Sequence, residues 1–228
     1  RAAAGAGIIS RRRLAADAFE NVKFRLRGST DAGTEKVKAR VGAVLADRQP
    51  RDFQRLGPQV LAGVLPRLYP QMLDIAWGHQ DAGRKVYIAT AASQETGDLI
   101  AHVLGFDGSV GTRFELDGEG RYTGRLVGPM AYRDGKAQRV RELAVAEDID
   151  LAESFAYSDS ESDLPFLEAV GHPVVVNPDP DLLRIARERG WDILRFERLG
   201  GRLKMLGALT AASVAGGAVL SGRRRPAR

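Results

Sequence analysis

The sequence contains no cysteine, which excludes a disulfide framework and any metal site built from thiolates. This absence fits a reducing compartment, and we expect a cytoplasmic protein. Histidine is scarce, and His79, His102 and His172 show none of the paired spacing that indicates metal ligands. The chain also lacks Gly-x-Ser-x-Gly, Walker-type and His-Glu-x-x-His patterns, so nothing favours a serine hydrolase, a P-loop protein or a zinc protease.

A basic surface interleaved with aromatic residues is missing as well, although the net charge is +5. The excess positive charge lies mostly near the two ends, at residues 11–13 and 223–225. Nucleic-acid binding needs such charge gathered on one face. We therefore expect no nucleic-acid partner.

Apolar residues at helical spacing predict helices throughout residues 1–82, where no strand pattern occurs. Four helices are expected to begin near residues 10, 31, 50 and 71, with prolines and glycines between them. In the second helix, Val37, Val41, Val44 and Leu45 are expected to face inward. These residues are interpreted as an all-helical domain.

From residue 83 onward, β-rich runs alternate with helical stretches. This alternation predicts an α/β core over residues 83–198 with a Rossmann-like, doubly wound parallel sheet. Residues 115–124 interrupt the alternation and are expected to form a hairpin around an Asp-Gly turn. The predicted strands cover residues 85–90, 107–114, 154–157, 173–176 and 193–196, and the predicted helices cover 94–104, 135–147 and 180–189.

Two aspartates four residues apart, Asp159 and Asp163, follow the strand 154–157 directly. Ligands of open α/β sheets bind beyond the carboxyl ends of strands, and a pair of carboxylates there suits a hard cation such as Mg²⁺. The alternative is structural: Ser160 and Asp163 would form a capping box for the helix that begins at Leu164.

Thr90, Lys136 and Asn177 are further candidates, each with a structural alternative. Thr90 ends a strand, where its hydroxyl and the N–H groups of Ala91 and Ala92 could face an anion, or it is an ordinary β-branched strand residue. Lys136 lies at a helix start, where the helix dipole disfavours a cation, so it either pairs with a carboxylate or a phosphate or is an ordinary solvated lysine. Asn177 precedes a proline and is either a turn residue or a residue that supports the site.

Taken in order, Thr90, Lys136 and the pattern Asp159-x-x-x-Asp163 resemble the second, third and fourth motifs of the haloacid dehalogenase superfamily of phosphohydrolases. The chain looks like the phosphoserine-phosphatase-like branch, subfamily IB, in which a helical cap lies between the first and second motifs. The likeness covers about residues 5–196 and includes residues 122–124, 171–173 and 176–179.

The resemblance implies a Mg²⁺-dependent phosphatase that acts on a small phosphorylated substrate. Thr90, with Ala91, would hold a phosphoryl oxygen, and Lys136 would balance the charge of the nucleophile and the phosphate. Asp159 would bind Mg²⁺, while Asp163 would orient the metal site and Asn177 would support it. Residues 1–82 would be the cap, in which only Arg25 and Arg27 suggest substrate contacts.

The first motif of this family, Asp-x-Asp-x-Thr, is absent from the sequence. It carries the aspartate that becomes an aspartyl-phosphate, and Asp17 does not replace it because Asp17 lies within the first predicted helix. The sequence begins at Arg1, and Met72, Met130 and Met205 are its only methionines. We expect the nucleophile to lie upstream and the chain as given to be inactive.

The absent motif has a consequence for folding. The strand that carries it is central in this family, so the strands ending at Thr90 and Tyr157 should each lose a neighbour. These two strands should then either pair with each other or leave the fold poorly stable.

The absent motif also leaves an alternative function open. The chain could be a non-catalytic phosphate-binding or scaffolding protein that has lost its first motif.

The tail, residues 199–228, is rich in alanine and glycine and ends in basic residues. Residues 205–222 contain no charge and would form a helix of about 27 Å, slightly short of a ~30 Å hydrocarbon core. This stretch indicates either a membrane anchor or a flexible tail.

Overall fold

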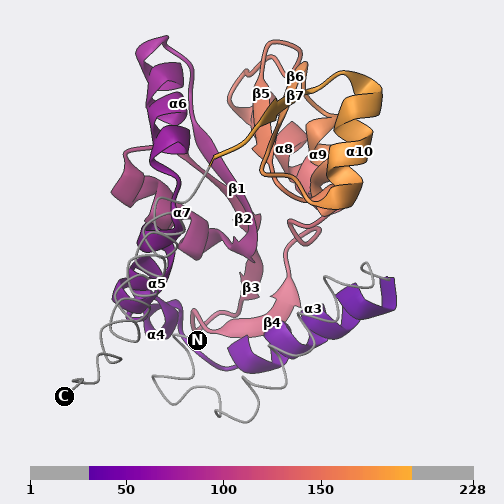
Figure 1. Cartoon of the computed structure of the whole chain (residues 1–228). Coiled ribbons are helices and arrows are strands. Elements are labelled where there is room, and N and C mark those ends of the chain that lie inside the picture. Colours follow the sequence, from indigo (N-terminus) through magenta and orange to yellow (C-terminus); the bar gives the residue numbers. More distant parts are fainter. Residues whose placement is uncertain (1–30, 197–228) are drawn as a thin grey trace, which may run out of the picture. The chain divides into compact units, whose positions relative to one another are not determined.

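The computed structural model describes residues 31–196. The chain is divided at residue 194 into two units, and the elements described below all belong to the first (Figure 1). The predicted helix at 10–27, with Asp17, Arg25 and Arg27, and the tail at 199–228 lie outside the described residues. Between residues 31 and 196, no helix is both long enough and apolar enough to cross a membrane.

The helices expected in residues 31–82 are confirmed. They are α3 (Asp31–Leu45), α4 (Pro50–Gln54), α5 (Gly57–Val64), the 3₁₀ helix η1 (Leu65–Arg67) and α6 (Pro70–Asp81). A proline in the first turn begins each of the last four, because proline fixes φ at a helical value and its missing N–H has no intrahelical partner there. Leu45 is buried as expected, whereas Val41 is 38% exposed, so the predicted inward position of Val41 is wrong.

Strand β1 (Tyr87–Ser93) pairs in parallel with β2 (Gly108–Thr112), and α7 (Gln94–Leu104) connects them. Ser93 begins α7 by accepting a hydrogen bond from the Thr96 N–H, and Gly105 ends it in the left-handed conformation. The register of the pair shifts between Ala89 and Ser93. The backbone is therefore irregular at the predicted phosphate-binding residues.

The predicted hairpin is confirmed as β3 (Phe114–Leu116) and β4 (Tyr122–Leu126), which pair antiparallel. Helix α3 crosses β4 with two glycines in contact. A Cβ atom on Gly42 would clash with the carbonyl oxygen of Gly124, and one on Gly124, whose φ is +81°, would lie 2.8 Å from the carbonyl oxygen of Gly42. Glycine at both positions lets the helix lie directly against the hairpin.

The third sheet has the order β5-β6-β7 and is parallel throughout. Its strands are β5 (Phe155–Ser158), β6 (His172–Val176) and β7 (Asp192–Leu194). They alternate with the 3₁₀ helix η2 (Glu161–Asp163) and the helices α8 (Asp134–Ala146), α9 (Leu164–Leu167) and α10 (Pro180–Arg189). The core beneath this sheet is formed by Ala156, Leu167, Val175, Leu182 and Ala186.

The α/β fold class is confirmed, but the described strands form separate sheets (Figure 1). Within residues 31–196, β1 pairs only with β2, and β5 pairs only with β6. The two strands expected to lose a shared neighbour thus do not pair with each other. The division into a cap ending at residue 82 and a core from residue 83 stays a prediction.

Candidate functional site

Thr90 lies within β1, in its irregular part, and the strand continues to Ser93. The prediction that the strand ends at Thr90 is therefore wrong. The Thr90 hydroxyl oxygen accepts a hydrogen bond from the Ala92 N–H at 3.1 Å. This contact orients the side chain and leaves the hydroxyl hydrogen able to donate to an anion. The Ala92 N–H, predicted to face an anion, is instead bonded to Thr90.

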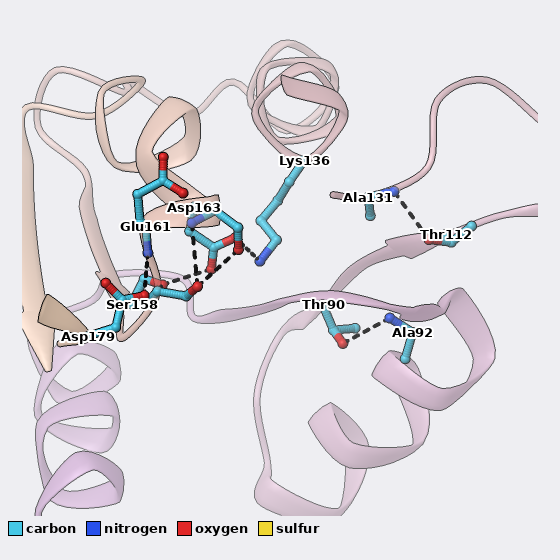
Figure 2. Close-up of polar contacts among 11 residues, drawn as sticks. Thr90, Ala92, Thr112, Ala131, Lys136, Ser158, Glu161, Asp163 and Asp179 are labelled. Carbon is cyan, nitrogen blue, oxygen red and sulfur yellow. Dashed lines mark hydrogen bonds and ion pairs between the residues drawn. The ribbon is translucent and has the colours of Figure 1, made fainter. Parts of the chain in front are cut away.

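Thr112, at the end of β2, connects two segments of the site. Its buried hydroxyl donates to the Ala91 carbonyl oxygen at 3.0 Å. The same hydroxyl accepts from the Ala131 N–H at 3.1 Å (Figure 2). The first partner belongs to the Thr90 segment and the second to the loop that leads into α8. Thr112 therefore fixes the Thr90 segment relative to the start of the helix that carries Lys136.

Arg139 also binds the loop that leads into α8. It is buried, and its guanidinium donates to the carbonyl oxygens of Pro129, at 2.8 Å, and Val127, at 2.5 Å. Burial, together with the charge of Arg113, lowers the pKa of Arg139 from its usual value. The loop before α8 is thus fixed by two side chains, Thr112 and Arg139, neither of which the sequence pattern singled out.

Lys136 lies in the first turn of α8 and points to Asp163 (Figure 2). Its Nζ lies 2.5 Å from Asp163 Oδ1, and the Ser158 hydroxyl donates to Asp163 Oδ2 at 2.7 Å. The expected carboxylate partner of Lys136 is therefore present. The capping alternative is confirmed for Ser160, which precedes η2 as its N-cap and accepts a hydrogen bond from the Ser162 N–H. Asp163 does not complete a capping box, because its carboxylate binds Lys136 and the Ser158 hydroxyl.

Asp159 differs from Asp163 in being exposed. The turn that carries it is held by Asp179, whose N–H donates to the Asp159 carbonyl oxygen at 2.9 Å. The Asp179 carboxylate accepts from the N–H groups of Glu161, at 2.9 Å, and Leu182, at 2.8 Å. Asp179 thereby joins the Asp159 turn to the start of α10. Its sequence context at a helix start could have indicated this capping role.

A metal ion would find only part of its ligand set in the described residues. Within 31–196, no group of three or more histidine, aspartate or glutamate side chains is arranged to hold one. Asp159 fits as a single anionic ligand because its carboxylate is exposed, whereas the Asp163 oxygens are bonded to Lys136 and Ser158. Oxygen donors of this kind suit Mg²⁺.

The predicted residues thus form two groups. Lys136 contacts Asp163, next to the Asp159 turn, whereas Thr90 and Ala91 belong to a different sheet and connect to α8 through Thr112. Asn177 adopts a positive φ of 46°, as a turn residue before proline can. Its supporting role at the site stays a prediction.

A cluster at the start of β5 shows how two of the histidines are used. His79 Nε2 lies 2.8 Å from the Tyr157 hydroxyl, and its ring lies 4.8 Å from that of Phe155, which stacks on His172 at 4.5 Å. Burial, followed by the nearby charge of Arg84, lowers the pKa of His79. Burial also raises the pKa of Tyr157.

Comparison with known proteins agrees with the sequence resemblance. The family description "haloacid dehalogenase-like hydrolase" matches residues 1–168. The phosphoserine phosphatase SerB1 of Mycobacterium tuberculosis is 37% identical over 215 residues, which cover 91% of this chain and 68% of that protein.

Solved structures show the same fold. A protein of unknown function from Bordetella pertussis superposes with a TM-score of 0.72 at 31% sequence identity. The superposition covers 85% of this chain and 87% of the Bordetella chain. A probable phosphoserine phosphatase from Vibrio cholerae shares the fold with a TM-score of 0.56 at 22% sequence identity. The superposition covers 86% of this chain and 57% of the Vibrio chain.

Proposed function

The chain belongs to the haloacid dehalogenase-like hydrolases, as a phosphatase, and we propose that it serves Mg²⁺-dependent hydrolysis of small phosphomonoesters through an aspartyl-phosphate. The observation that carries this proposal is the ion pair between Lys136 and Asp163 beside an exposed Asp159. A lysine with few solvent contacts at a helix start, where the dipole opposes it, needs a nearby anion to offset its charge.

Each residue has a distinct part in this proposal. The Thr90 hydroxyl and the Ala91 N–H would bind phosphoryl oxygens, and Lys136 would offset the negative charge that gathers where phosphate meets the nucleophile. Asp159 would hold Mg²⁺, which supplies further neutralisation of the phosphoryl group when bound. Asp163 positions Lys136 through their contact, and Asn177 would support this end of the sheet.

In this proposal the nucleophile is not one of the 228 residues of the sequence, because the sequence contains no Asp-x-Asp-x-Thr pattern. The separate pairing of β1 and β5 supports the idea that another strand lies between them in the active protein. The chain as given should then be inactive and less stable than a chain extended through that motif. The loss of a covalent nucleophile costs on the order of a million-fold in rate.

The test uses a chain extended upstream through its first motif, with p-nitrophenyl phosphate as substrate and Mg²⁺ present. Asp159→Asn should lower kcat/KM at least about a hundredfold, because it removes a ligand charge from the cation site. Its melting temperature should stay the same, since the side chain is exposed. Glu153→Gln, at another exposed acidic position, is the matched control and should leave both values unchanged.

A different result would favour the alternative, a phosphate-binding or scaffolding protein without catalytic activity. In that case the upstream sequence would lack the motif, or Asp159→Asn would leave phosphate release unchanged. The cytoplasmic location stays a prediction, as does the membrane tether, which rests on residues 205–222 outside the described part of the chain.

A further inference from the structure

A cavity of about 340 Å³ opens beside the Thr90 segment. It is lined by Ala91 and Ala92, the residues that follow Thr90, and by Ser93. The rest of the lining comes from α3, from Phe53 of α4, from Thr112 of β2, from the hairpin and from Met130 in the loop before α8. A phosphate bound by the Thr90 segment would therefore have the remainder of its ester next to this cavity.

The walls of the cavity are mainly apolar, and two of its aromatic side chains pack against a buried tyrosine ring. Phe53 and Phe114 line it, and each meets the ring of Tyr122 edge-on, with centroids 5.9 and 6.2 Å apart. Tyr122 is itself buried. Such edge-to-face contacts stabilise the ring positions. Val41, 38% exposed on α3, also lines the cavity, so an apolar ligand would cover a side chain that otherwise contacts water.

The polar side chains of the cavity already have partners within the protein. The Ser93 hydroxyl accepts from the Thr96 N–H, and the Thr112 hydroxyl bridges two backbone groups. None of the described lining residues is acidic. Glu95 does not line the cavity, and its Oε1 accepts a hydrogen bond from the Tyr122 hydroxyl. A substrate ammonium group would thus find no carboxylate among these residues, and sugar hydroxyls would find few free partners.

The charged residues that line the cavity, Lys38 and Arg40, are both cationic. Lys38 contacts Glu35 at 2.6 Å, in an ion pair at the surface whose stabilising effect is small. Positive charge around an apolar cavity favours the approach of an anionic substrate such as a phosphomonoester.

We propose that this cavity binds the alcohol part of the substrate and selects an apolar group, aromatic or branched aliphatic, over an amino acid or a sugar. The proposal rests on the phosphatase function proposed above. An apolar cavity of about 150 Å³ holds a benzene molecule, so about 340 Å³ admits a group roughly twice that size, such as a naphthyl ring.

The experiment measures kcat/KM for phosphate release by the chain extended through its first motif. The substrates are 1-naphthyl phosphate, O-phospho-L-serine and glucose 6-phosphate. We expect 1-naphthyl phosphate to exceed each of the other two at least about tenfold, because transfer of an ammonium or several hydroxyls into an apolar site without partners is costly.

A pair of variants on α3 tests whether the cavity causes this preference. Val41→Glu places a carboxylate on the cavity wall and should lower the ratio of 1-naphthyl phosphate to phosphoserine activity about tenfold. Ala43→Glu adds the same charge at an exposed position of the same helix that does not line the cavity, and it should leave the ratio unchanged.

The outcomes separate the two proposals. Higher activity on phosphoserine or glucose 6-phosphate, or an equal effect of the two variants, overturns the apolar specificity and leaves the phosphatase function standing. If none of the three substrates is hydrolysed in an Asp159-dependent manner, the proposed function fails, and the specificity fails with it.

Discussion

Lys136 Nζ and Asp163 Oδ1 lie 2.5 Å apart, with only 8% and 14% of their side chains exposed. The ring of Phe166 lies 5.8 Å from the same ammonium group. Two charges with so little water around them depend on each other, because either one alone would keep its desolvation cost without a compensating partner. The pair joins α8 to the turn that carries Asp159.

Lys136→Ala should therefore be strongly destabilising, by about 3–5 kcal/mol, because it leaves the Asp163 carboxylate without its cation. The double variant Lys136→Ala/Asp163→Ala should lose less than the sum of the two single variants, by about 1 kcal/mol or more. Urea denaturation of the four proteins measures this coupling. Lys85→Ala breaks an exposed pair with Glu147 and is the control, expected to change the denaturation midpoint little. Additive single effects would contradict the prediction.

Thr112→Val should weaken both stability and catalysis. Valine keeps the shape but leaves the Ala91 carbonyl and the Ala131 N–H without their partner, at a cost of about 1–3 kcal/mol. Activity should fall as well, since the Thr90 segment and the start of α8 would no longer be connected. Thr112→Ser keeps the hydroxyl and should recover most of the activity. The denaturation midpoint and kcat/KM of each variant test this prediction. If Thr112→Val and Thr112→Ser lose stability and activity equally, the hydroxyl is unimportant.

Gly42→Ala should separate α3 from β4, because the added methyl group clashes with the carbonyl oxygen of Gly124. We expect a loss of about 1–3 kcal/mol, although alanine is the better helix former. Gly63→Ala on α5, where a new Cβ meets nothing within 4 Å, is the matched control and should be neutral or stabilising by up to about 1 kcal/mol. Thermal unfolding compares them, and similar midpoints would contradict a tight helix crossing.

His79 should make stability fall in mild acid. Its pKa in the folded protein lies below the usual 6.5, first because of burial and then because of Arg84, so the unfolded chain binds a proton more readily. Its contribution is fully present above the usual pKa of 6.5 and is lost as the pH falls through the lower pKa of the folded protein. His79→Gln should flatten this part of the melting-temperature profile, while His102→Gln, at an exposed position, is the control. An unchanged slope in His79→Gln would reject this assignment.

Local patterns were sufficient for most elements. Alternating β-rich and helical runs, with the Asp-Gly hairpin, predicted the strands and α-helices between residues 83 and 194, since hydrophobic period and turn residues act over short distances. The 3₁₀ helix η2 was not predicted. The helix after Asp163 is the exception in length. It ends at Leu167, although the apolar spacing continues to Val170. The Ala169 N–H bonds to the Phe166 carbonyl oxygen in a turn, and the Gly171 N–H donates to the distant Leu151 carbonyl oxygen, so the helix does not continue.

The order of Thr90, Lys136, Asp159 and Asp163 was visible in the sequence, because it depends only on the succession of strand ends and helix starts. Their partners were decided by tertiary structure. Nothing in the spacing indicated that Thr112 would bridge Ala91 and Ala131, since this bridge requires β2 to lie beside β1. Likewise, Val41 was expected inside a helical core, and only the crossing of α3 over β4 places it at a cavity. A sequence fixes each residue's chemistry and local conformation, but contacts between distant segments follow from how whole elements pack.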